Sequence, residues 1–93
     1  MAQGLSVLLL LDPLSELKVA KDSSVAMMRE LAARGHDVWS TTLSELHWLD
    51  GEVRARAQLL RLFAPSADGA WFEVIEHAVQ PLASFDAVLM RKD

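Results

Sequence analysis

The sequence feature that most constrains the fold is an apolar run near the start of the chain, residues 5–11, LSVLLLL. Asp12 and Pro13 end this run abruptly. A continuous apolar run between breakers is typical of a strand that is buried on both faces, as in a parallel sheet. Pro13 has no N–H to donate and keeps Asp12 extended, so the strand should end there. We therefore predict a central strand over residues 5–11.

A helical pattern follows this strand after a polar loop. It opens with the tetrad KDSS, residues 21–24, in which Asp22 and Ser23 are good N-cap residues. Gly35 lies where a left-handed C-cap is favoured. The apolar residues at helical spacing, which should pack on the strand, are Val25, Met28, Leu31 and Ala32. Strand, loop and helix make the first half of a βαβ unit, and open α/β sheets bind ligands beyond the carboxyl ends of their strands.

The rest of the chain contains both clear and ambiguous segments. Residues 36–42, HDVWSTT, predict a second strand parallel to the first. Asp50-Gly51 is a strong hairpin signal. Residues 52–63 alternate as a strand would but consist of good helix formers, so the local sequence leaves both structures open. Residues 71–79 also fit a strand or a short helix, whereas residues 87–90, AVLM, predict another central strand.

The composition of the chain argues against several classes of function. The net charge of -4 disfavours a nucleic-acid binder, which normally has a basic face. The absence of cysteine excludes disulfides, thiol catalysis and thiolate metal sites, and it fits a cytoplasmic protein. The three histidines have no partner at i+3 or i+4, so no metal site is expected. The first apolar run is too short to cross a membrane and lacks the basic segment of a signal peptide.

Three polar features are predicted to meet at one edge of the sheet: Asp12 after the first strand, the KDSS tetrad, and Arg91-Lys92-Asp93 after the last strand. Each also has a purely structural explanation: Asp12 can simply end the first strand, KDSS can cap the helix, and the charged residues can be the polar end of the last strand. In the functional interpretation, the helix N-terminus and its serine hydroxyls bind a carboxylate or phosphate, and Arg91 captures a substrate carboxylate. The chain contains no G-x-G-x-x-G, P-loop or G-x-S-x-G motif.

Taken in order, the motifs of this chain resemble those of bacterial glutathione synthetase. Residues 7–39, VLLLLDPLSELKVAKDSSVAMMRELAARGHDVW, are similar to that family's opening strand, D-P-[IL] loop, K-D-S-[ST] tetrad and helix ending in R-G. Residues 46–60, LHWLDGEVRARAQLL, are similar to its L-x-x-x-x-G-E-[AV]-R-A segment. Residues 71–93, WFEVIEHAVQPLASFDAVLMRKD, are similar to its stretch ending in M-R-K-D. The resemblance covers nearly the whole chain.

This resemblance implies a fold class and a function. The fold class is α/β, a three-layer Rossmann-like pre-ATP-grasp domain with a mostly parallel sheet and a β-hairpin, in which residues 52–62 form a hairpin arm. The family joins γ-glutamylcysteine to glycine through an acyl phosphate made with ATP and Mg²⁺, which bind mainly in later domains. Residues 1–93 would be a single N-terminal domain, a fragment of a longer chain that walls the substrate cleft and carries homo-oligomer contacts.

The resemblance also implies a set of substrate-binding residues facing the cleft: Asp12, Lys21, Asp22, Ser23, Arg91, Lys92 and Asp93. No catalytic or metal-binding residue is expected in this chain, which alone should be catalytically silent. Two alternatives stay open: a stand-alone Rossmann-like binding or regulatory domain, and a receiver-like signalling domain. The absent glycine motif counts against the first, and the lack of a second acidic residue beside Asp12 counts against the other. A P-P-F-D continuation after Asp93 would decide for the ligase.

Overall fold

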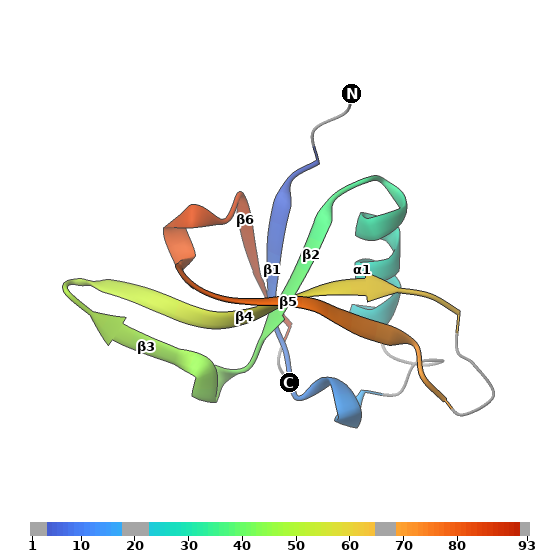
Figure 1. Ribbon diagram of the computed structural model, residues 1–93, viewed down its shortest axis with the longest axis horizontal. Helices are drawn as coiled ribbons and strands as arrows, with labels where there is room; N and C mark the ends of the chain where they lie inside the picture. Colours follow the sequence, from blue (N-terminus) through green and yellow to red (C-terminus); the bar gives the residue numbers. More distant parts are fainter. Residues whose placement is uncertain (1–3, 18–22, 65–68, 92–93) are drawn as a thin grey trace.

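The computed structural model describes residues 4–17, 23–64 and 69–91. These residues form one curled six-stranded sheet with an α-helix packed against it (Figure 1). The strand order is β3-β4-β2-β1-β6, and β5 pairs with β4 outside this path. In Figure 1, β1, β2 and β6 run through the centre of the molecule, whereas β4 and β5 cross in front of them.

β1, Ser6–Leu10, is the central strand of the parallel part of the sheet. β2, Asp37–Thr41, pairs with one edge of β1, and β6, Ala87–Met90, pairs with the other, both in parallel. Leu8 and Leu9 are fully buried, which confirms the strand predicted from the apolar run. The prediction that residues 87–90 form a central strand is wrong, because among the described strands β6 pairs with β1 alone and ends the sheet.

The remaining strands make the sheet mixed. β4, Glu52–Leu62, pairs antiparallel with β2, with β3 (Leu46–Leu49) and with β5 (Phe72–Pro81). The prediction of a mostly parallel sheet is therefore wrong: within the described ranges, two pairings are parallel and three are antiparallel. The reason is that both ambiguous segments of the sequence fold as long strands that run back along their neighbours, without the helical crossover that a parallel pairing needs.

The hairpin predicted at Asp50-Gly51 is confirmed, and with it the strand that follows. The φ angles are +53° at Asp50 and +82° at Gly51, and positive φ at both central residues is what a type I′ turn requires. Along β4, Ala55 and Ala57 are buried while Arg56 between them is exposed. This alternation, together with strand partners on both edges, overrides the helix propensity of the segment.

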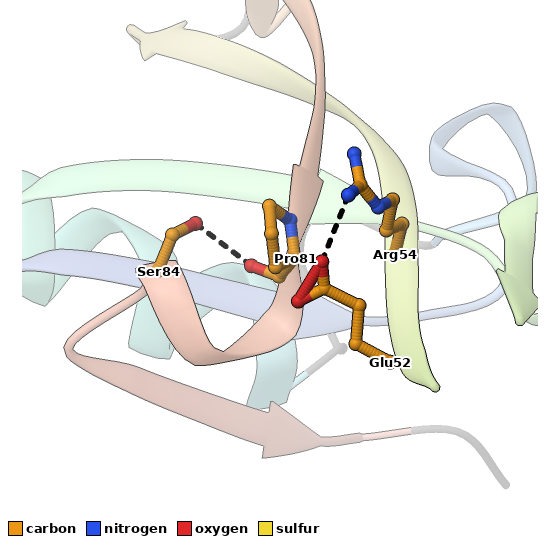
Figure 2. A network of polar contacts seen from close by, with 4 residues as sticks. All are labelled: Glu52, Arg54, Pro81 and Ser84. Atoms are coloured by element: carbon orange, nitrogen blue, oxygen red, sulfur yellow. Dashed lines mark hydrogen bonds and ion pairs between the residues drawn. The ribbon is translucent and has the colours of Figure 1, made fainter. Parts of the chain in front are cut away.

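Figure 2 shows the polar contacts where β5 ends beside the hairpin. Arg54 and Glu52 of β4 form an ion pair with 2.8 Å between Nη2 and Oε1. Arg54 is also the register partner of Pro81, the last residue of β5. Ser84 Oγ donates a hydrogen bond to the Pro81 carbonyl at 2.7 Å. This bond fastens the 3-10 helix Leu82–Ser84, which leads towards β6, to the end of β5.

α1, Ser23–Ala33, covers one face of the sheet. Val25 and Met28 are fully buried in a cluster with β1, and Leu31 packs at the border of the same cluster, as predicted. Ala32 was expected on this face as well but is exposed. It lines an open groove together with Leu62 and Phe63 of the β4 end.

Gly35 ends α1 as the sequence predicts. Its φ is +86°, a conformation in which glycine has no steric penalty. The Gly35 N–H donates to the Ala32 carbonyl at 3.0 Å, and the His36 N–H donates to the Leu31 carbonyl at 3.1 Å. These two bonds form a Schellman motif. The N-terminal cap predicted at Asp22 lies outside the described residues.

The core has two parts, one on each face of the sheet. Beneath α1, Val7 and Leu9 of β1 pack with residues of the helix and of β4. On the opposite face, Leu8 packs with Trp39 and Phe85, whose rings meet edge to face with centroids 5.8 Å apart. In the described part of the chain this second face is covered by β4 and by the segment before β6, which includes the 3-10 helix Leu82–Ser84, and not by an α-helix. The predicted three-layer arrangement is therefore not confirmed.

Leu8→Asp should prevent folding, because Leu8 is 0% exposed and an unpaired buried charge costs several kcal/mol. Circular dichroism and urea unfolding measure the effect. Leu43→Asp is the matched control, since Leu43 is 56% exposed and its replacement should change the free energy of unfolding by less than about 0.5 kcal/mol. Unfolding of Leu8→Asp at the same urea concentration as the unchanged chain would contradict the buried strand.

Candidate functional site

The carboxyl ends of β2, β1 and β6 meet at one edge of the sheet. The Leu11 N–H donates to the Thr41 carbonyl at 3.0 Å, and the Arg91 N–H donates to the Leu10 carbonyl at 2.9 Å. These bonds continue the parallel pairing by one residue beyond β1 and β6, and they fix the backbone of Leu11 and Arg91. Asp12 therefore begins its loop between the ends of β2 and β6, which is where open α/β sheets bind ligands.

Arg91 reaches from the end of β6 to the N-terminus of α1. Its Nη2 donates to Ser23 Oγ at 2.7 Å, and its Nε donates to Ser24 Oγ at 3.4 Å. Ser23 is exposed, Ser24 is buried and Arg91 is half-buried. The structure thus brings together Ser23 and Arg91, two predicted site residues that are 68 positions apart. Their role in substrate binding stays a prediction.

The contact with the serines leaves Arg91 able to bind an anion. A guanidinium carries five N–H donors in a planar fork. The serine contacts use one N–H of Nε and one of Nη2, so three of the five N–H donors of Arg91 are not used by the serines. The positive end of the α1 dipole lies next to them. This arrangement suits a carboxylate or a phosphate, which guanidinium groups bind through paired hydrogen bonds.

The other predicted site residues are described only in part. Asp12 is half-buried and lines a hollow of about 280 Å³. Four more candidates lie outside the described residues: Lys21, Asp22, Lys92 and Asp93. Ser23 and Arg91 do not line the hollow. The sheet edge therefore carries two polar features, the Arg91–Ser23 pair on the β6 side of Asp12 and the hollow on its β2 side.

The hollow is lined mainly by residues that the sequence analysis did not identify. They come from the loops after β1 and β2 and from β2, β4 and β5: Pro13, Leu14, Ser40, Thr41, Thr42, Ser44, Glu45, Arg56, Gln58 and His77. Gln58 Nε2 donates to Ser40 Oγ at 3.4 Å. One signal was available in the sequence, since Ser40 and Gln58 are polar where Val38 and Leu60, two residues away on the same strands, are apolar.

Within residues 4–17, 23–64 and 69–91, no group of three or more His, Cys, Asp or Glu side chains is placed to hold a metal ion. The same ranges contain no helix with the length and apolar character needed to span a bilayer.

Comparison with known proteins identifies close relatives of the chain. Residues 5–93 match the family described as "Prokaryotic glutathione synthetase, N-terminal domain". The chain is 47% identical over 87 residues to the glutathione synthetase of Nitrosomonas europaea and 48% identical over 96 residues to that of Bordetella pertussis. It is 34% identical over 85 residues to the glutathione synthetase of an Escherichia coli strain.

These matches cover most of this chain but a minor part of each relative. They include 90%, 94% and 91% of the chain, and 27%, 28% and 26% of the respective relatives. The chain thus spans about a quarter of the length of the curated relatives it matches. The family match extends over Asp12, Ser23 and Arg91.

Arg91→Ala should lower the free energy of unfolding by about 1 kcal/mol, because it removes charge-assisted hydrogen bonds to Ser23 and Ser24. Arg61→Ala is the control: it removes an ion pair to Glu73 in which the arginine side chain is 68% exposed, so the change should stay within about 0.5 kcal/mol. Urea unfolding compares the two variants. Equal losses would show that the contact of Arg91 with α1 contributes no more than a surface pair.

Proposed function

This chain belongs to the family of prokaryotic glutathione synthetase N-terminal domains, and from this membership we propose that it serves a ligase that joins γ-glutamylcysteine to glycine. The ligation uses ATP and passes through an acyl phosphate. The observation that carries the proposal is the contact between Arg91 and Ser23, because it unites the KDSS and MRKD motifs at one sheet edge. The family match favours this function over a stand-alone binding domain or a receiver-like domain.

In this proposal the domain forms one wall of the peptide-substrate cleft. The residues that face the cleft are Asp12, Lys21, Asp22, Ser23, Arg91, Lys92 and Asp93. Among them, Arg91 contacts a carboxylate of the substrate. Two observations support this role: the bond from the Arg91 N–H to the Leu10 carbonyl holds its backbone at the strand end, and its contacts with Ser23 and Ser24 orient the guanidinium.

ATP and Mg²⁺ are assigned to other parts of the ligase. Acyl-phosphate chemistry requires the γ-phosphate, the metal ion and the substrate carboxylate to be held in line while charge moves. The sequence has no P-loop, and the described residues offer no set of ligands for a metal ion. In this proposal the nucleotide binds in the ATP-grasp domains.

The same proposal includes the domain type and its contacts. The β1-α1-β2 unit with β6 supports classification as a Rossmann-like pre-ATP-grasp domain, to which the antiparallel strands are an addition. The β3-β4 hairpin leaves Trp48 71% and Leu49 46% exposed, which suits contact with another subunit or another domain. We also propose that the ligase is a cytoplasmic homo-oligomer.

The full-length ligase should hydrolyse ATP in a manner that depends on both γ-glutamylcysteine and glycine, whereas residues 1–93 alone should be inactive. The reason is that the proposal assigns the nucleotide and the metal to the ATP-grasp domains, in line with a sequence without a P-loop. A coupled ADP assay measures the turnover of both proteins. Turnover by residues 1–93 would contradict the assignment of ATP to other domains, and a full-length protein without this activity would contradict the proposed function.

Arg91→Ala in the full-length ligase should raise KM for γ-glutamylcysteine about tenfold, because it removes a charge-assisted bond to the substrate carboxylate. The KM for ATP should not change. Arg61→Ala, on the exposed side of β4, serves as the matched control. Unchanged kinetics of Arg91→Ala would remove this residue from the substrate site without affecting the family assignment.

A further inference from the structure

A row of polar side chains crosses three strands at the floor of the hollow described above. Ser40 on β2 is the register partner of Gln58 on β4, and Gln58 is in turn the register partner of His77 on β5. Register partners point to the same face of a sheet. The three side chains therefore form a continuous row, and all three line the hollow.

A β-bulge in β5 places His77 in this row. The register of β5 against β4 shifts at Ile75, between Val74 and Glu76. In a regular strand Val74 and His77, three positions apart, would point to opposite faces. The bulge brings both to the same face, where Val74 packs against the cluster beneath α1 and His77 lines the hollow. Bulges commonly redirect side chains in this way beside binding sites.

The polar row directly borders the apolar core beneath α1. Val38 and Leu60, two residues from Ser40 and Gln58 along the same strands, are buried in the core beneath α1. Ser40 is only 2% exposed, yet its hydrogen bond with Gln58 is long, at 3.4 Å. Burying a polar group at a core position costs stability unless it is hydrogen-bonded. Local departures from the fold's pattern are expected at functional or strained sites.

The walls of the hollow carry charges of both signs. Arg56 lies two residues before Gln58 on β4 and so projects from the same face. Its carbonyl accepts a hydrogen bond from Thr41 Oγ1 at 3.0 Å, which ties this part of β4 to the end of β2. Its guanidinium makes no ion pair with another side chain of the described residues. The carboxylates of Asp12 and Glu45 line the same hollow.

We propose that this hollow binds a ligand end that carries both a free α-amino group and a free α-carboxylate. Arg56 binds the carboxylate, Glu45 and Asp12 accept hydrogen bonds from the ammonium group, and Gln58 and His77 form the floor. The volume of about 280 Å³ lies just below the roughly 300–1,000 Å³ of pockets for drug-sized ligands, so it suits one amino-acid unit. The inference rests on the proposed function for the ligand, since the glutamyl end of γ-glutamylcysteine carries both groups.

The test measures binding to the full-length protein by calorimetry without ATP. The two probes are γ-glutamylcysteine and 4-aminobutanoyl-cysteine, which lacks only the α-carboxylate. Arg56→Gln should weaken binding of γ-glutamylcysteine on the order of tenfold and leave binding of 4-aminobutanoyl-cysteine unchanged. Arg61→Gln is the matched control on the same strand, and it should alter neither affinity. Arg56 is exposed, so its variant should keep the melting temperature of the unchanged protein.

Two results would overturn the inference: an unchanged affinity of Arg56→Gln for γ-glutamylcysteine, or an equal loss for both probes. The binding measurement also separates this inference from the proposed function. If Arg56→Gln selectively loses γ-glutamylcysteine binding while the unchanged full-length protein shows no ligation, the result would support the binding role of the hollow and contradict the proposed ligase. Normal ligation by an Arg56→Gln protein with unchanged affinity would support the ligase and contradict the hollow.

Discussion

The structure depends on the burial of β1 on both of its faces. Leu8 and Leu9 point to opposite faces, and both are 0% exposed. A strand with two buried faces needs a partner along each edge for its backbone groups and an apolar cover on each side. β2 and β6 supply the edges, α1 covers one face, and the curl of β4 with the segment around Phe85 covers the other. Each of these elements meets one requirement that the apolar run imposes.

β4 connects the two parts of the core because it is long enough to pair with three strands. Its second half pairs with β2 and contributes Leu60 beneath α1, whereas its first half pairs with β3 and contributes Ala55 and Ala57 to the opposite cluster. The register of β2 with β4 ends at Ser40, the Thr41 Oγ1 bond to the Arg56 carbonyl adds one more contact, and the chain then leaves for the 3-10 helix Leu43–Glu45. The hollow lies beside this end of the pairing. The binding feature is thus a consequence of the way in which the sheet curls to cover β1.

Features with local causes can be predicted from this sequence, and features with distant causes cannot. The apolar run, Gly35 and Asp50-Gly51 identify a strand, a helix end and a hairpin because each depends on neighbouring residues. The pairing of β4 with β2 and the edge position of β6 depend on residues far apart in the chain, so a local pattern leaves them open. The meeting of Ser23 and Arg91 follows from the rule that carboxyl ends of parallel strands share an edge. The row at the floor of the hollow depends on strand register and on a bulge, and neither is visible before the strands are paired.

The two polar features lie at the same edge of the sheet and each includes an arginine. Arg91 follows β6, and the hollow with Arg56 lies beside the end of β2, with β1 and Asp12 between them. Neighbouring strands lie about 4.8 Å apart, so β6 and β4, the strands of the two arginines with β1 and β2 between them, are separated by roughly 14 Å at the backbone. An extended dipeptide spans about 7 Å and its terminal groups reach further. The substrate of the proposed function, γ-glutamylcysteine, has a carboxylate at each end. In this arrangement Arg56 beside the hollow and Arg91 beside α1 bind the two carboxylates of the same molecule. A substrate shortened by one amino-acid unit would then contact only one of the two arginines.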